Sequence, residues 1–393
     1  MKIRFAVLAA LGLLLGVGCD NAPDAEPVVH PGHLRDSAGV RVVEHDSIPS
    51  VLPTWTLSET PDLRIGSIEG EGPDVLGSVG GGVVRSDGVI VVGELQTQEL
   101  RAFSPEGEPL WVAGGPGQGP GELVALQGLF VLPGDSVLVQ DWGQDRASVF
   151  DPSGAFVRSF WVSPHEPGYF PPRFRGLLPD GTLVAEVQER QRGPEHEPHL
   201  LLAYYDTDGR LKEEPLGPFP FIRKVEPGLA SRRVSGVAGG GTGAAVLSYE
   251  RLEVRRYEAD GTLSMIVRAA REPAPVDAKR LVDEANYAPL FAEAYAAFPL
   301  VAGAGLVDSH DRTWVRESIP AYDERTPVWW VFGPDGKLLA RATFPEQFSV
   351  IHIERDHIVG VNLDEWEVPY LERRVIVRTP PPDVGSGGII YGG

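Results

Sequence analysis

The feature of this 393-residue chain that most constrains its fold is an internal repeat. Five segments share an apolar strand that ends in an aromatic residue and continues into a polar turn closed by glycine. They are AFSPEG at 102–107, VFDPSG at 149–154, YYDTDG at 204–209, RYEADG at 256–261 and VFGPDG at 331–336. Glycine readily adopts the positive φ that such turns need. Each segment therefore predicts a β-hairpin.

A second hairpin precedes each of these. Its turn is clearest at 85–88, 132–135 and 178–181, each followed by an apolar run, and it recurs in weaker form at 239–243, 309–312 and 354–356. The chain thus contains six units. Two successive hairpins make four antiparallel strands, so the sequence predicts an all-β fold, a six-bladed β-propeller of four-stranded antiparallel blades.

The sixth unit lacks a last strand of its own, because the TPPP run at 379–382 and a glycine-rich tail follow it. A candidate lies near the N-terminus. The segments LRIG at 63–66 and GPDVL at 72–76 parallel LWVA at 110–113 and GPGEL at 119–123. We therefore predict that this N-terminal strand closes the last blade, with residues 41–43 or 55–57 adding to its edge. Such closure removes exposed sheet edges.

The first residues have the pattern of an export signal. Lys2 and Arg4 precede a 13-residue apolar run at 5–17, which is too short to span a bilayer, and Cys19 is the only cysteine. This N-terminus resembles a bacterial lipoprotein signal. The resemblance implies a signal peptide at 1–18, lipidation of Cys19, and a flexible tether at 19–35. An ordinary secretory signal followed by a chance cysteine is the alternative.

The body of the chain also resembles a family. DSAGVRVVE at 36–44, GPGE at 119–122, and LVD at 306–308 with TWVR at 313–316 are similar to six-bladed β-propeller proteins of the NHL-like type, which are often bacterial lipoproteins. The resemblance covers residues 36–379 and leaves 380–393 as a disordered tail. It implies a fold and no particular activity, because propellers host many functions.

Charge and motifs exclude some function classes. A formal net charge of -20 repels phosphate backbones, which argues against a nucleic-acid partner. The sequence has no Gly-x-Ser-x-Gly motif and no phosphate-binding glycine loop followed by lysine, so nucleotide chemistry has no support.

Long connections predict a loop-rich face, on which the links between blades and the turns between second and third strands open together. Segment 276–298 predicts two short helices separated at Pro289, inserted between blades four and five. These helices either cap the ring or form a lid over a ligand. Further long loops are predicted at 164–172 and 212–233, and binding sites commonly lie on such loops.

The end of each second strand places a polar residue near the predicted channel mouth. These residues are Glu94, Asp141, Glu186, Ser248, Arg316 and Asn362. Glu94, Asp141, Glu186 and Arg316 are candidates for gripping a polar ligand or a divalent cation. The other interpretation, which we prefer, is that the carboxylates accept backbone hydrogen bonds. His196 and His199 have metal-ligand spacing, but Pro198 between them favours an exposed loop, so no metal ligand and no catalytic residue is assigned.

Three functional hypotheses follow. The first is an exported lipoprotein, anchored at the periplasmic or outer face of a bacterial envelope membrane, whose loop-rich face binds a protein or an extracellular polysaccharide without enzymatic activity. The alternative is a divalent-metal-dependent hydrolase or lyase with its site at the channel mouth. The third is a structural part of an envelope complex.

Overall fold

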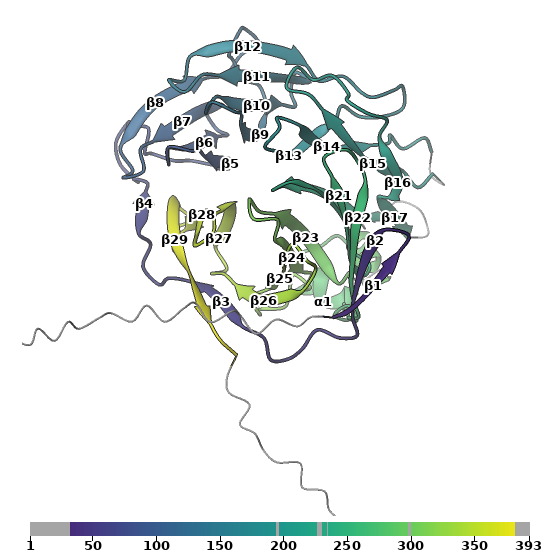
Figure 1. Ribbon diagram of the computed structural model, residues 1–393. Helices are drawn as coiled ribbons and strands as arrows, with labels where there is room; N and C mark the ends of the chain where they lie inside the picture. The colour runs from purple at the N-terminus through teal and green to yellow at the C-terminus, as the bar shows by residue number, and fades with distance from the viewer. Residues whose placement is uncertain (1–31, 194–195, 226–229, 234, 298–299, 382–393) are drawn as a thin grey trace, which may run out of the picture.

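The computed structural model describes residues 32–193, 196–225, 230–233, 235–297 and 300–381. Its strands are arranged around a common centre (Figure 1), and nearly all of its secondary structure is β. Several sheets are four-stranded and antiparallel, as in a β-propeller. The predicted signal peptide, Cys19, most of the tether, and residues 382–393 of the tail lie outside the described residues.

Three sheets follow one another along the first half of the chain, and in each the strands pair in sequence order. The first contains β5 (Val79–Val84), β6 (Ile90–Glu94), β7 (Glu99–Phe103) and β8 (Pro109–Gly114). The second contains β9 (Leu126–Val131), β10 (Val137–Asp141), β11 (Arg146–Phe150) and β12 (Phe156–Trp161). The third contains β13 (Arg173–Leu177), β14 (Leu183–Gln188), β15 (His199–Tyr205) and β16 (Leu216–Pro220).

The next sheet is extended by the N-terminus. Its own strands are β19 (Ser235–Gly240), β20 (Gly243–Ser248), β21 (Leu252–Glu258) and β22 (Leu263–Ala269). Strand β2 (Val40–His45) runs parallel to β22, and β1 (His33–Ser37) pairs with β2, so strand structure begins inside the predicted tether. Of the two segments predicted to add to the edge of the sixth unit, residues 41–43 do not join it, whereas residues 54–57 pair with its last strand. Val43 is instead buried with Val267 and Phe332.

The last two groups of strands are joined through the N-terminal segment. One group is β23 (Ala302–Val307), β24 (Thr313–Glu317), β25 (Val328–Phe332) and β26 (Leu338–Thr343). The other is β27 (Phe348–Ile353), β28 (His357–Leu363) and β29 (Pro369–Thr379). Strand β3 (Thr54–Leu57) pairs with both β26 and β29. Strand β4 (Leu63–Ile65) is antiparallel to β29, with Ile65 opposite Leu371.

The five predicted glycine-closed turns are confirmed. Each joins the third and fourth strands of a group and has a backbone hydrogen bond across it, such as Gly107 N to Ser104 O at 2.9 Å. The closing glycines have φ values from 80° to 94°. A side chain is strained in that region, which is why glycine recurs at this position.

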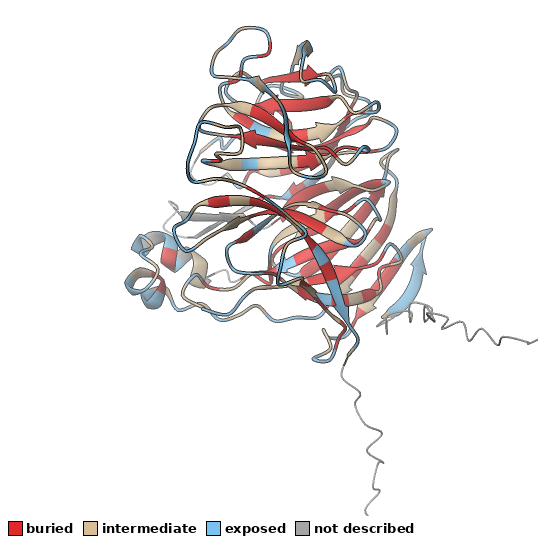
Figure 2. Cartoon of the chain, turned by 90° about the vertical axis from the view of Figure 1, so that its left-hand side faces the viewer, coloured by how far each residue is buried: buried red, intermediate tan, exposed pale blue. Residues whose placement is uncertain are grey.

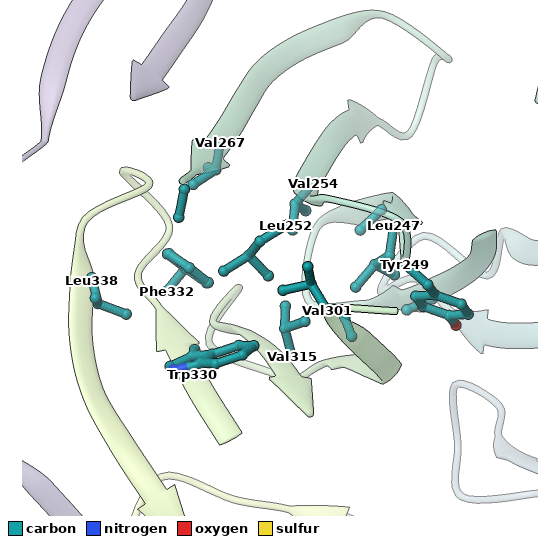
Figure 3. Close-up of a cluster of buried hydrophobic side chains, with 14 of the residues drawn as sticks. Leu247, Tyr249, Leu252, Val254, Val267, Val301, Val315, Trp330, Phe332 and Leu338 are labelled. Carbon is teal, nitrogen blue, oxygen red and sulfur yellow. The ribbon is translucent and has the colours of Figure 1, made fainter. Parts of the chain in front are cut away.

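The core lies between neighbouring sheets rather than in one central mass. Figure 3 shows side chains from β20 to β22 meeting side chains from β24 to β26, with Trp330 and Phe332 beside Leu252 and Val315. Every residue of the middle strands β6, β10 and β11 is buried, whereas the outer strands β8 and β12 alternate between exposed and half-buried residues. Figure 2 shows exposed residues at the periphery of the molecule. The alternation of apolar residues thus locks each sheet against the next.

Two short helices confirm the predicted helical insertion. They are α1 (Ala278–Asp283) and α2 (Pro289–Ala297), and they project from one side of the molecule (Figure 2). Asp277 caps α1 by accepting a hydrogen bond from Lys279 N at 2.9 Å. Pro289 begins α2, where its missing N–H costs no hydrogen bond. In the described residues no helix has the length and apolarity needed to span a bilayer.

The prediction of one long loop at 212–233 is wrong. This segment contains β16 and a separate hairpin of β17 (Ile222–Val225) and β18 (Ala230–Arg233), against which α2 packs. Its apolar residues alternate too briefly to be distinguished from a loop by pattern alone.

Candidate functional site

The first strands of the six groups surround one cavity. β5, β9, β13, β19, β23 and β27 all line it, and its volume is about 820 Å³. This volume lies within the range of small-molecule sites. Glycines keep the inner strands close together, because a Cβ on Gly176 would collide with the backbone of Gly239. The wall of the cavity consists mostly of glycines and apolar side chains, and its polar side chains lie toward its two ends.

The two ends of the cavity differ in chemistry. Arg175, Arg233 and Tyr249 line the end at which β13 and β19 begin. This end opens on the loop-rich face. Asp308 and His352 line the other end, where the hairpin turns lie. Burial lowers the pKa of His352, while the nearby carboxylates of Glu354 and Asp308 oppose that shift.

Glu94 is used within its own sheet. Its side chain is almost completely buried, and its oxygens accept hydrogen bonds from the backbone N–H groups of Gly77, Ser78 and Gln96 at 2.9–3.1 Å. Both carboxylate oxygens are therefore occupied by the loop that enters β5 and the turn that leaves β6.

Asp141 has the same role one sheet further on. It is fully buried and accepts from the backbone N–H groups of Val124, Ala125 and Gly143 at 2.9–3.0 Å. Gln144 Nε2 adds a fourth hydrogen bond at 2.7 Å. The geometry of Glu94 and Asp141 matches the backbone-accepting interpretation.

Glu186 differs, because its partners are charged. It is fully buried, and its oxygens accept from Arg175 at 3.3 Å and Arg233 at 2.5 Å. The side-chain amide of Gln188 and the backbone N–H of Val237 complete its hydrogen bonds. These groups come together because β13 and β19 are neighbours in space.

Electrostatics at Glu186 favour its ionised form. Burial alone raises the pKa of Glu186, but the charges of Arg175 and Arg233 together with its hydrogen bonds outweigh burial, so the pKa lies below its ordinary value. A third cation, Arg173, lies over the Trp142 ring, 4.1 Å from its centroid. Burial and repulsion from Arg175 and Arg233 lower the pKa of Arg173.

Arg316 is not joined to this cluster. It makes no hydrogen bond or ion pair with Glu94, Asp141 or Glu186 in the described residues, and partial burial lowers its pKa. Asn362, the equivalent residue on β28, donates to Glu372 at 3.4 Å. The four predicted site residues are therefore not linked by direct contacts.

The predicted histidine pair has an acidic partner that the sequence did not reveal. The Nε2 atom of His196 and the Nδ1 atom of His199 each lie 3.2 Å from Glu189 Oε2. Arg192 lies 3.2 Å from the other oxygen of Glu189, so this carboxylate also forms an ion pair with a guanidinium group. Across the described ranges, no group of three or more His, Cys, Asp or Glu side chains is arranged to hold a metal ion.

Exposed aromatic side chains lie at the end of the sheets that carries the links between groups and the turns between second and third strands, which is the loop-rich face. Among the described residues, the aromatic side chains counted as exposed are Trp161 (71%), Phe170 (39%), Phe291 (49%) and Trp366 (78%). Trp161 ends β12 at the same end of the sheet as Asp141, since both residues pair with Arg146. Phe170 follows in the link to β13, Phe291 lies on α2, and Trp366 lies between β28 and β29.

Sequence reasoning missed Arg173, Arg175, Arg233 and Tyr249. The first two form an Arg-x-Arg pair directly after two prolines, at the start of a strand. Alternation places both side chains on one face of a strand, and that pattern was an available signal. Arg233 carries no comparable signal, because it lies on the separate hairpin of β17 and β18, 47 residues after Glu186.

Comparisons with known proteins bear on the fold. No family model matches the sequence, and no curated protein matches it. A solved structure from Bacteroides fragilis, of a protein described by name as exported, matches with a TM-score of 0.53 and 12% identity, over 85% of this chain and 99% of that chain. A DUF4221 family member from Bacteroides vulgatus matches with a TM-score of 0.50 and 12% identity, over 83% and 99%. Both are propeller-type folds, and identities this low concern the fold alone.

Proposed function

We propose that this chain is an exported six-bladed β-propeller lipoprotein of the NHL-like type, which binds a protein or extracellular polysaccharide through its loop-rich face. Six inner strands around one cavity support the blade count. The pairing of β4 with β29 supports closure of the last blade by the N-terminal segment. The propeller would span residues 36–379.

One observation carries the binding role: the exposed aromatic side chains share a face. Isolated exposed apolar residues are common and need no explanation. Aromatic residues, however, are enriched at the centres of binding interfaces, where they supply most of the binding energy. Trp161 and Trp366 come from different sheets, yet both are exposed at the loop-rich end of their sheets, which supports a binding surface on that face.

The anchor follows from the N-terminal residues. A signal peptide at 1–18 and lipidation of Cys19 would tether the propeller to the periplasmic or outer face of an envelope membrane. The residues between the lipid and β1 would let the loop-rich face reach its partner.

The test compares partner recovery by full-length variants in cells. We expect a Trp161→Ala, Trp366→Ala double variant to lose most of the cross-linked partner that the unaltered chain recovers. Val157→Ala is the matched control, because Val157 is also exposed on β12 but lies away from that end of the strand. Equal recovery by the tryptophan variant and the control would remove the aromatic face from the proposal. Membrane extraction of Cys19→Ser tests the anchor separately.

A further inference from the structure

The loop-rich end of the cavity carries an excess of positive charge within an acidic protein. Arg175 and Arg233 line the cavity, and Arg173 lies beside them, opposite Glu186 in the pairing of β13 with β14. The three guanidinium groups interact electrostatically with one another and with Glu186. Three guanidinium groups and one carboxylate leave this group with a net charge of +2, whereas the whole chain has -20. Partly buried cations in excess of their counter-ions are costly unless an anion joins them.

Glu186 orients two of these arginines without using up their donors. It takes one N–H group of Arg175 and one of Arg233. A guanidinium has five N–H donors in a fixed fork. Arg175 Nε is buried and has no hydrogen-bond partner in the described part of the chain. Glu186 is therefore a positioning residue that holds two forks at the cavity mouth with donors to spare.

Tyr249 completes the polar end. Its ring packs in the core between sheets, while its hydroxyl group points away from the other labelled side chains in Figure 3. A Cβ on Gly236 would lie 2.4 Å from the Tyr249 hydroxyl and 2.8 Å from an Arg233 nitrogen. The two donor groups thus converge over a glycine, in a space that any side chain would fill.

We propose that Arg173, Arg175, Arg233 and Tyr249 bind an oxyanion group of the ligand, a carboxylate, phosphate or sulfate, at the mouth of the central cavity. This inference rests on the proposed binding function and names the chemistry of its ligand. Arginine forks match the planar geometry of carboxylates and the oxygens of phosphates, and such hydrogen bonds are strong because both partners are charged. The 820 Å³ cavity behind the mouth has room for the group that bears the anion.

The experiment titrates the purified full-length chain in detergent with three probes: sodium sulfate, inorganic phosphate and sodium glucuronate. Sodium chloride holds ionic strength constant. Binding is followed by calorimetry and by the rise in Tm that a ligand of the folded state produces. We expect at least one probe to bind, and the preferred probe distinguishes a carboxylate ligand from a phosphate or sulfate ligand.

Variants locate the bound anion. Arg175→Gln and Arg173→Gln should each weaken the binding of the preferred probe at least tenfold. Arg210→Gln, the same charge change at an exposed hairpin turn, should leave binding unchanged. Gly236→Ala alters no charge and should also weaken binding, because its methyl group displaces the Tyr249 and Arg233 donors. It keeps the test valid if an arginine variant fails to fold.

The outcomes are distinct. No binding of any probe beyond the chloride control, or equal weakening by Arg175→Gln and Arg210→Gln, would overturn the oxyanion site. The proposed binding function would still stand in that case if partner recovery in cells depends on Trp161 and Trp366. Loss of that dependence, with anion binding intact, would instead refute the aromatic face.

Discussion

The buried carboxylate of Glu94 gives the sharpest test of the distinction between structural and ligand-binding groups at the channel mouth. Glu94→Ala removes the acceptor of three backbone N–H groups. A hydrogen bond to a charged group contributes roughly 1.5–3 kcal/mol. Gly77 and Gln96 are exposed, so water can replace part of the hydrogen bonding that their N–H groups lose. We therefore expect the free energy of unfolding to fall by about 3–5 kcal/mol.

The expected shift in Tm follows from the size of the domain. Unfolding entropy is about 2.1 cal/mol/K per residue, or about 0.7 kcal/mol/K for about 340 residues, so Tm should fall by about 4–7 °C. Glu94→Gln keeps one oxygen and should lose about half as much. Differential scanning calorimetry measures both variants. Neither should change the affinity for the oxyanion probes, since Glu94 lies on β6, away from the arginines.

Two results would refute this reasoning. A Glu94→Ala variant with unaltered Tm would mean that its hydrogen bonds contribute nothing to stability. A variant with normal Tm and lost ligand binding would mean that Glu94 contacts the ligand directly. The carboxylates at the channel mouth would then be ligand-binding groups.

Two further predictions concern pH and turn packing. Glu186 has a folded-state pKa below its ordinary 4.5, so its contribution to stability is present above 4.5 and is lost as pH falls through the folded-state value. The Tm gap between the unaltered chain and Glu186→Gln should therefore narrow in acid, and a constant gap from pH 7 to pH 3 would contradict the pairing. Gly336→Ala and Gly39→Ala place alanine at φ values of 81° and 85°, which costs about 1–2 kcal/mol in each. Only Gly336 would also press its Cβ on Val43 and Met265, so its variant should lose about 1–3 kcal/mol more in urea unfolding, and equal losses would rule out the packing effect.

Local features of the fold were predictable from the sequence. The turns at Gly107 and Gly154 depend on a φ that glycine adopts best, and the break at Pro289 depends on a missing N–H group. Such constraints act within a few residues, so a pattern along the chain reveals them.

Long-range pairings were not predictable in the same way. Strand β2 carries the alternation of an edge strand, but nothing in Val42 or Val43 names β22 as its partner. The segment at 212–233 mixes proline, glycine and charge, which hides β16 and the hairpin of β17 and β18. These choices depend on which apolar faces remain uncovered once the sheets have packed.

The candidate site was predictable in one part only. The position of Glu186 on a second strand followed from the repeat, although β14 continues two residues further to Gln188, and the burial of Glu186 followed from the fold. Its arginine partners did not follow, because Arg175 and Arg233 are 58 residues apart and meet across two sheets. The excess of positive charge at the cavity mouth arises because residues far apart in the sequence lie close together in the fold. Spacing along the chain does not reveal it.

The most direct test of this account is a crystal structure of the full-length chain soaked in sodium selenate, whose selenium atom gives an anomalous signal at the position of a sulfate-like anion. The account predicts an anomalous peak within hydrogen-bond distance of Arg175 and Arg233 at the loop-rich end of the cavity. Absence of a peak there, with selenate bound elsewhere on the protein, would contradict the assignment of this mouth as the ligand site.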